Sequence, residues 1–326
     1  MEKFTKLYKN ERIKIDKKII GVFKNRKPAS LYEPASYIMV NPGKRLRPFI
    51  VLACAKAVGG KFSDAYNAAV AVELLHNFTL VHDDIMDNAD KRRGLLTLHK
   101  RYDLSTAILV GDSLLAIAYE YILKDVSDKH KQVVGLFTRG LVEVCEGQSL
   151  DKIFETRERV TIEEYMEMIK KKTALLVEMC CSIGAHLGGG SKQQIKALEN
   201  YGLNLGIAFQ IQDDLLDITA QEAEFGKVIG GDLIEGKKTY LFLKALQKAT
   251  GANKKKLLQV ILNKGIKPEE VNLFRDLYEE LGVLKDAREE IAKFTSKSLK
   301  SLKLIPQRKD RELLEWLAHS LIKRTK

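Results

Sequence analysis

This chain of 326 residues is poor in the residue types that mark several protein classes. It has four cysteines, Cys54, Cys145, Cys180 and Cys181, and no CxxC pair, which argues against a disulfide framework and a cysteine-based metal site. Each cysteine lies in an apolar run, so we expect buried free thiols. No apolar run approaches the roughly 18 residues that predict a transmembrane helix. The first residues also lack the apolar stretch of a signal peptide, so we expect a cytoplasmic protein.

Proline is scarce too, and its distribution favours helices. The six prolines leave residues 49–267 without any. Apolar residues recur at three- and four-residue spacing, whereas alternating strand patterns are almost absent. This spacing predicts helices over 50–58, 64–88, 104–124, 129–150, 162–187, 192–218, 238–248, 253–263, 268–281, 284–303 and 309–324. Because no change of composition marks a linker, the sequence predicts one all-α domain over residues 1–326.

The charge balance indicates an anionic ligand without identifying it. Lysine and arginine number 55 against 43 acidic residues, which gives a formal net charge of +12. Such a charge attracts nucleic acid, anionic membrane surfaces or small phosphorylated molecules. The lysine-rich stretches do not interleave aromatic residues as a nucleic-acid platform does. We therefore expect no nucleic-acid partner.

The most informative feature is an acidic cluster that occurs twice, as Asp83-Asp84-Ile85-Met86-Asp87 and as Asp213-Asp214-Leu215-Leu216-Asp217. Positions i and i+4 of a helix share a face and i+1 lies beside it, so the carboxylates of each cluster can converge. Two carboxylates about 4 Å apart repel by roughly 4 kcal/mol at an effective dielectric of about 20. Mg²⁺ prefers a few aspartate oxygens together with water and phosphate. The two clusters predict a magnesium site for a phosphorylated ligand.

A single acidic cluster on a helix is more often a solvated face than a site. Here largely apolar segments precede both clusters, over 78–81 and over 209–211, and basic residues follow both. A surface helix would instead carry a polar face several turns long. The repetition in this setting favours function.

A basic segment lies upstream of the first cluster. Lys44, Arg45 and Arg47 stand between Gly43 and Pro48, which indicates a loop that enters a helix. Backbone amides at a helix start favour phosphate, and arginine offers two donors to it. Taken alone, such a loop is more often solvated surface.

One histidine shares a helical face with the first cluster. His76 precedes Asp83 by seven residues, or two turns, whereas His82 points elsewhere and is expected to be structural. The sequence has no nucleophile elbow, Walker loop or metal-spaced His/Cys set. The chemistry is therefore expected to depend on metal ions and phosphate charge.

These motifs together resemble the trans-isoprenyl diphosphate synthases, the polyprenyl synthetase family, and most of all its short-chain archaeal geranylgeranyl diphosphate synthases. The resemblance spans, in the family's order, GKRLRP at 43–48, DDIMD at 83–87, RRG at 92–94, GD at 111–112, GQ at 147–148, KT at 172–173, FQIQDDLLD at 209–217 and GKKT at 236–239. It implies an all-α, isoprenoid-synthase-type bundle around a central cavity. It also implies a homodimer and three Mg²⁺ ions in each active site.

The resemblance further implies roles for single residues. The Mg²⁺ ligands would be Asp83, Asp84, Asp87, Asp213, Asp214 and Asp217. The allylic diphosphate would be held by Arg92, Lys172, Lys227 and Lys237. The diphosphate of isopentenyl diphosphate would be held by Lys44, Arg47, His76 and Arg93. The reacting centre would be lined by Lys172, Thr173 and Gln210.

The implied reaction condenses isopentenyl diphosphate with dimethylallyl, geranyl or farnesyl diphosphate. Mg²⁺ and cationic side chains would promote ionisation of the allylic diphosphate, and positioning would bring the isopentenyl double bond onto the cation. The departing pyrophosphate would take the proton, which is consistent with the lack of a conventional base. Phe78 and Thr79, five and four residues before Asp83, would floor the product tunnel in the archaeal pattern for a C20 product.

Several alternatives remain open at this stage. The product could be farnesyl diphosphate or a mixture of C15 and C20 chains. A terpene cyclase would replace the second aspartate cluster, and a non-catalytic subunit of a heteromeric synthase would have lost one cluster. A basic nucleic-acid-binding helical protein would leave both acidic clusters unexplained.

Overall fold

The structure, a computed structural model, describes residues 2–40, 43–125, 131–220 and 229–322. Most of these residues are helical, which confirms the all-α prediction. The described strands are β1 (Lys91–Arg92) and β2 (Leu95–Leu96), which pair antiparallel with Arg92 opposite Leu95.

The chain forms two compact units. Unit 1 comprises residues 1–138, 179–198 and 304–316, and unit 2 comprises 139–178, 199–303 and 317–326. Each passage of the chain from one unit to the other lies within a helix. The prediction of one domain over residues 1–326 stays a prediction.

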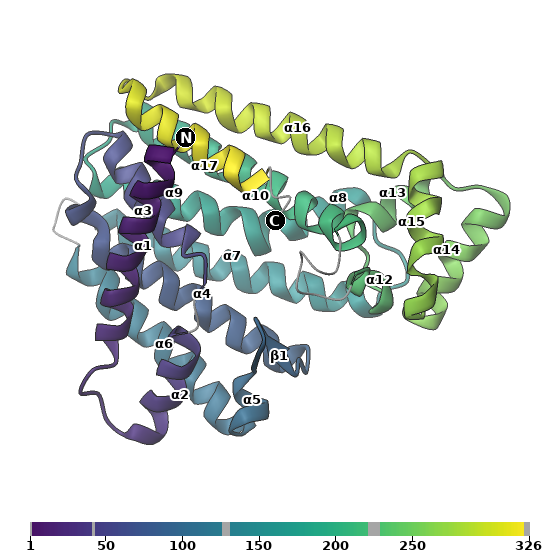
Figure 1. The fold of residues 1–326 in the computed structure, drawn as a ribbon, viewed down its shortest axis with the longest axis horizontal. Helices are drawn as coiled ribbons and strands as arrows, with labels where there is room; N and C mark the ends of the chain where they lie inside the picture. The colour runs from purple at the N-terminus through teal and green to yellow at the C-terminus, as the bar shows by residue number, and fades with distance from the viewer. Residues whose placement is uncertain (1, 41–42, 126–130, 221–228, 323–326) are drawn as a thin grey trace. The chain divides into compact units, whose positions relative to one another are not determined.

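Unit 1 is built around α4, which lies beside α6 in Figure 1. Its elements are α1 (Glu2–Val22), α2 (Ala29–Val40), α3 (Leu46–Ala57), η1 (Phe62–Ala65), α4 (Tyr66–Met86), α5 (Leu98–Arg101) and α6 (Leu104–Lys124), with the start of α7 (Lys131–Thr156) and parts of α9 (Leu175–Leu187), α10 (Lys192–Thr219) and α17 (Arg308–Ile322). The α4 segment 68–72 consists of alanine and valine and is fully buried. A Cβ at Gly111 of α6 would lie 2.3 Å from His82 Nε2, so glycine lets α6 approach α4 closely.

Unit 2 gathers shorter helices around α16. Besides its parts of α7, α9, α10 and α17, it contains α8 (Ile162–Ile169), a π-helical segment (Lys170–Ala174), α12 (Gly231–Ile234), α13 (Tyr240–Lys248), α14 (Gly251–Asn263), η4 (Pro268–Glu270), α15 (Val271–Glu280), α16 (Val283–Ser301) and most of η5 (Leu302–Leu304). Figure 1 shows α13 and α15 near the start of α16, in agreement with their contacts. Tyr165, Tyr278 and Phe242 are fully buried in the core of this unit.

Several helix predictions agree closely with the structure, and one region does not. The predicted helices 104–124 and 192–218 correspond to α6 and α10. The sequence predicted no helix before residue 50, yet α1 and α2 lie there, and Pro34 is inside α2. In α1 only Glu11, Ile15, Ile19 and Val22 are buried, so its apolar stripe is too sparse for a clear periodic signal.

The cysteine prediction is correct for three residues and wrong for one. None of the four forms a disulfide, and Cys54, Cys180 and Cys181 are buried. Cys145 is exposed, as is its neighbour Glu146 on α7.

One helix among the described residues, α6, is long and apolar enough to cross a membrane by length and composition alone, with a mean hydropathy of 1.5. A single such helix is weak evidence, since core helices of soluble proteins have the same composition. Leu104, Ile108, Leu109 and Leu123 of α6 are exposed within this chain.

Candidate active site

The first acidic cluster lies at the C-terminal end of α4. Asp83 and Asp84 occupy its last turn, and Asp87 is the residue that follows the helix. The negative end of the helix dipole lies here and destabilises the three carboxylates. The carboxylates also repel one another. A bound cation would relieve both contributions.

Asp84 is the buried member of this cluster, with 6 % of its surface exposed. Burial raises the pKa of Asp84, and the charge of Arg92 opposes that rise. Arg92 donates from Nε to Asp84 Oδ1 at 2.6 Å. The β1–β2 hairpin makes this contact possible, because Arg93 and Gly94 take left-handed backbone angles at its turn. Asp84, Arg92 and Arg93 also line a small cavity of about 40 Å³.

The three cations of the basic segment at 43–48 have two different roles. Arg45 is buried and donates to Asp16 Oδ1 at 2.8 Å, to Glu73 Oε1 at 2.6 Å and to the Met39 carbonyl at 2.6 Å. Lys44 is exposed. Arg45 therefore holds the loop, while Lys44 and Arg47 remain the candidates for phosphate.

Arg47 and His76 contact each other directly. Arg47 Nη1 donates to His76 Nε2 at 3.2 Å. Burial first, then the positive charges of Arg47 and Arg93, hold the pKa of His76 well below its usual range. A neutral imidazole can accept this hydrogen bond, so His76 orients Arg47 without adding charge.

Arg93, at the turn of the β1–β2 hairpin, extends to the basic segment at 43–48. A Cβ at Gly43 would lie 2.7 Å from Arg93 Nη1, so glycine leaves room for this guanidinium beside the basic segment. Burial and the nearby arginines lower the pKa of Arg93, although Glu73 opposes them. Unit 1 thus gathers Arg47, His76 and Arg93, three of the four residues expected to hold isopentenyl diphosphate, next to the loop that carries Lys44. Such crowding of positive charge favours an anion.

The second acidic cluster occupies the last two turns of α10. Asp214 is buried, and burial together with the charge of Asp232 raises its pKa to about 7. Hydrogen bonds oppose that rise: Tyr165 OH donates to Oδ2, the Tyr240 amide donates to Oδ2 at 3.0 Å, and Gln210 Nε2 donates to Oδ1 at 3.2 Å. Protein donors therefore reach both carboxylate oxygens of Asp214.

Asp217 and Lys237 lie near the short helix α12. The Asp232 amide donates to Asp217 Oδ2 at 3.2 Å, and the Gly230 amide donates to the Asp217 carbonyl at 2.7 Å. Lys237 Nζ lies 2.7 Å from Glu235 and 3.7 Å from Asp232. Lys227, the other cation predicted in this region, lies outside the described residues.

Lys172 and Thr173 belong to the π-helical segment between α8 and α9. A Cβ at Gly147 of α7 would lie 2.2 Å from the Lys172 backbone nitrogen. A Cβ at Gly206 of α10 would lie 2.5 Å from Ala174 Cα. Both glycines thus let a helix touch the backbone of this segment. A π-bulge shifts side chains relative to an α-helix and is frequent at functional sites.

The side chains of the π-helical segment have defined partners. Lys172 Nζ lies 2.5 Å from Asp151 Oδ2. Thr173 Oγ1 donates to Gln210 Oε1 at 3.0 Å. The structure therefore brings together Thr173 and Gln210, which were expected at the reacting centre.

The structure draws attention to three further polar residues to which sequence reasoning gave no individual role. That reasoning counted Arg45 only among the cations of the basic segment and assigned no role to Asp151; the partners of both residues are distant in sequence. It also assigned none to Gln148, a buried side chain whose amide atoms have no hydrogen-bond partner in the part of the chain that the structure describes. The signal for it was its place in the GQ motif at 147–148, which the resemblance includes.

The predicted chain-length residues lie on α4. Phe78 is 8 % exposed and packs edge-on against the His82 ring, with centroids 4.7 Å apart. Thr79 donates to the His76 carbonyl at 2.8 Å. Their role as a tunnel floor stays a prediction.

The donor set suits a cation that brings further ligands. Across residues 2–40, 43–125, 131–220 and 229–322, no three His, Cys, Asp or Glu side chains form a metal site by themselves. Mg²⁺ usually takes one or two carboxylates and completes its shell with water and substrate phosphate. Each acidic cluster, near the C-terminal end of its own helix, offers carboxylates for that manner of binding.

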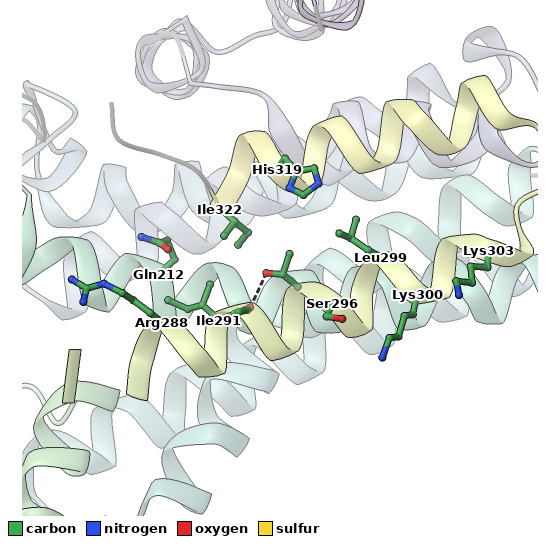
Figure 2. Close-up of a pocket in the computed structure, with 11 residues that line it drawn as sticks. Gln212, Arg288, Ile291, Ser296, Leu299, Lys300, Lys303, His319 and Ile322 are labelled. Atoms are coloured by element: carbon green, nitrogen blue, oxygen red, sulfur yellow. Dashed lines mark hydrogen bonds between the residues drawn. The ribbon is translucent and has the colours of Figure 1, made fainter. Parts of the chain in front are cut away.

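A separate groove of about 570 Å³ lies in unit 2 between α10, α16 and α17 (Figure 2). Ile291, Leu299 and Ile322 form much of its apolar surface, and Arg288 lies at its edge. None of the predicted site residues that the structure describes lines it; Gln212, the neighbour of Asp213 in sequence, does.

Comparison with known proteins agrees with this geometry. The chain is 40 % identical to the geranylgeranyl pyrophosphate synthase of Geoglobus acetivorans, over 95 % of this chain and 96 % of that protein. It is 38 % identical to the geranylfarnesyl diphosphate synthase of Natronomonas pharaonis, over 92 % of both. The solved geranylgeranyl pyrophosphate synthetase of Pyrococcus horikoshii matches with a TM-score of 0.91 and 38 % identity, over 99 % of both chains.

The fold and these relatives define the class: the protein is a prenyltransferase with the all-α isoprenoid synthase fold. The polyprenyl synthetase family profile matches residues 28–281, and the chain belongs to this family.

Proposed function

We propose that this enzyme condenses isopentenyl diphosphate with dimethylallyl, geranyl and farnesyl diphosphate, with Mg²⁺, to give geranylgeranyl diphosphate. The observation that carries the proposal is the placement of both acidic clusters at the C-terminal ends of long helices, α4 and α10. Carboxylates and helix dipole there act together in favour of cations. Geranylgeranyl diphosphate synthases among the relatives support the C20 product.

We propose that three Mg²⁺ ions bind in each site. Their protein ligands would be Asp83, Asp84, Asp87, Asp213 and Asp217. The resemblance also places Asp214 in this ligand set. When bound, Mg²⁺ neutralises diphosphate charge and favours its departure from the allylic carbon. Lys44, Arg47, His76 and Arg93 hold the diphosphate of isopentenyl diphosphate. Thr173 and Gln210 face the carbocation, and pyrophosphate accepts the proton lost on condensation.

The cations proposed for the allylic diphosphate form ion pairs with carboxylates in this structure. Arg92 pairs with Asp84 at 2.6 Å, Lys172 with Asp151 at 2.5 Å and Lys237 with Glu235 at 2.7 Å. The two lysine pairs are partly exposed on both sides, so exchange of their carboxylates for a diphosphate oxygen costs little. Asp84 is buried, so release of Arg92 requires a cation at that carboxylate. Lys227 is proposed as a fourth cation from the resemblance alone.

Product length is the part of the proposal with a specific rival. The relative from Natronomonas pharaonis is named for a product one isoprene unit longer than C20. The barrier to longer chains is assigned to Phe78 from the resemblance, and Phe78 is buried on α4. Farnesyl diphosphate or a C15/C20 mixture is the shorter alternative.

We further propose a homodimer in the cytoplasm. The exposed apolar residues of α6, Leu104, Ile108, Leu109 and Leu123, would be covered by a second copy of the chain. In a reducing cytoplasm the free thiols Cys54, Cys145, Cys180 and Cys181 would stay reduced.

The proposal is tested by incorporation of labelled isopentenyl diphosphate into extended diphosphates, with Mg²⁺ and with EDTA. Asp83→Asn and Asp213→Asn should each lower kcat by at least about 100-fold while the helical circular dichroism stays unchanged. Asp276→Asn, an exposed aspartate of α15, is the matched control and should keep full activity. Activity in EDTA, or full activity in either cluster variant, would contradict the metal assignment.

A further inference from the structure

Asp214 is the centre of a buried hydrogen-bond network in unit 2. Its carboxylate receives the Tyr165 hydroxyl from α8, the Tyr240 amide from the start of α13 and the Gln210 amide from the preceding turn of α10. Tyr165 is 2 % exposed and Asp214 is 5 % exposed. The network continues from Gln210 Oε1 to the hydroxyl of Thr173.

The carboxylate fixes the direction of every hydrogen bond in this network. The carboxylate oxygens accept all three of these hydrogen bonds, so Gln210 turns its NH₂ group toward Asp214. The carbonyl oxygen of Gln210 then faces Thr173, and Thr173 must donate its proton to it at 3.0 Å. The lone pairs of the Thr173 hydroxyl are left for other partners.

This polarity suits an allylic cation. A hydroxyl oxygen whose proton is engaged elsewhere stabilises positive charge, whereas a hydroxyl proton aimed at the cation would destabilise it. The backbone beneath Thr173 is already fixed, since Gly147 and Gly206 let α7 and α10 touch the π-helical segment. The network therefore controls which way the hydroxyl points more than where it lies.

We propose that Tyr165 and Asp214 are positioning residues that polarise the Gln210–Thr173 pair toward the carbocation. This inference rests on the proposed function, and it replaces the predicted metal role of Asp214, because protein donors reach both of its carboxylate oxygens. Tyr165 matters because it is a buried donor to the carboxylate oxygen that also receives the Tyr240 amide. Without that donor, Asp214 Oδ2 keeps only the Tyr240 amide, so the carboxylate is held less firmly in the orientation that receives the Gln210 amide.

The test compares Tyr165→Phe and Asp214→Asn with Tyr278→Phe. Tyr278 is a matched control, because its buried hydroxyl has no hydrogen-bond partner among the residues that the structure describes. Tyr165→Phe and Asp214→Asn should lower kcat about 10-fold to 100-fold and change KM for either diphosphate by less than about 3-fold. They should also raise the share of allylic diphosphate that is hydrolysed to alcohol, because a poorly stabilised cation reacts with water more often. Tyr278→Phe should change none of these quantities.

Two further measurements separate positioning from metal binding and from simple loss of structure. Calorimetry of a non-reactive allylic thiolodiphosphate with Mg²⁺ should give Kd values within about 3-fold of wild type for both variants. In a double-mutant cycle with Thr173→Val, the effects of Tyr165→Phe and Thr173→Val should not multiply.

Three outcomes would overturn the inference. These are a kcat within about 2-fold of wild type for Tyr165→Phe, multiplicative effects in the cycle, or weakened Mg²⁺-dependent binding in Asp214→Asn alone. An inactive wild-type enzyme would instead reject the proposed function, and the binding data would still report on Asp214.

Discussion

Arg45 donates from Nη1 to Glu73 Oε1 at 2.6 Å, and the two side chains are only 2 % and 3 % exposed. The same guanidinium reaches Asp16 and the Met39 carbonyl, so it joins α1, α2 and α4 to the segment that carries Lys44 and Arg47. Burial lowers the pKa of Arg45, but the two carboxylates raise it further, and the net pKa is above its usual value. Arg45 is therefore a charged structural residue at the base of the proposed isopentenyl diphosphate site.

Replacement of Arg45 should destabilise the protein strongly. Arg45→Met leaves Glu73 buried without its partner, and loss of one member of a buried pair costs about 3–5 kcal/mol. Denaturant unfolding followed by circular dichroism measures this free energy. Arg12→Met is the matched control, because Arg12 lies 3.7 Å from the same Asp16 on the surface, where such pairs contribute about 0–1 kcal/mol. Equal losses in the two variants would contradict the role given to Arg45.

Gly147 should tolerate no side chain. Gly147→Ala places a Cβ 2.2 Å from the Lys172 backbone, so the π-helical segment must move. We expect a loss of stability of about 1–3 kcal/mol and a fall in kcat of at least about 10-fold. Gly135→Ala on the same helix meets nothing within 4 Å, and it should gain up to about 1 kcal/mol with unchanged activity. Full activity of Gly147→Ala would show that the segment adapts.

His76 should make stability depend on pH. Its pKa is lowered in the folded protein by burial and by Arg47, so below the ordinary histidine pKa the unfolded chain binds a proton that the folded protein refuses. Its contribution is therefore present above pH of about 6.5 and lost as pH falls, by at most about 1.4 kcal/mol per pH unit. Unfolding from pH 7.5 to 5.5 should show a smaller decline in His76→Gln than in wild type. Parallel curves would mean that His76 titrates normally.

Phe78 should limit product length. Phe78→Ala removes a ring that packs against His82 on α4, and the predicted tunnel floor would recede. Chromatography of the dephosphorylated products should then show chains longer than those of the wild type. An unchanged product distribution, with a folded variant, would remove Phe78 from the proposed tunnel.

The parts of this protein that sequence predicts are those governed by local patterns. The helix of residues 104–124 follows from apolar spacing, and the carboxylates of Asp83 and Asp87 follow from helix geometry. The π-helical segment does not, because its backbone contacts Gly147 and Gly206, which are distant in sequence. Spacing also could not show that Asp214 turns toward Tyr165, since that depends on which face of α10 meets α8.

The measurement that tests the central claim most directly is the chain length of the product. Purified enzyme would be incubated with Mg²⁺, labelled isopentenyl diphosphate and dimethylallyl diphosphate, and the dephosphorylated products separated by length. A dominant C20 alcohol is the predicted result. A dominant C15 or C25 alcohol would keep the reaction and contradict the product, and no extension from dimethylallyl, geranyl or farnesyl diphosphate would contradict the proposed function itself.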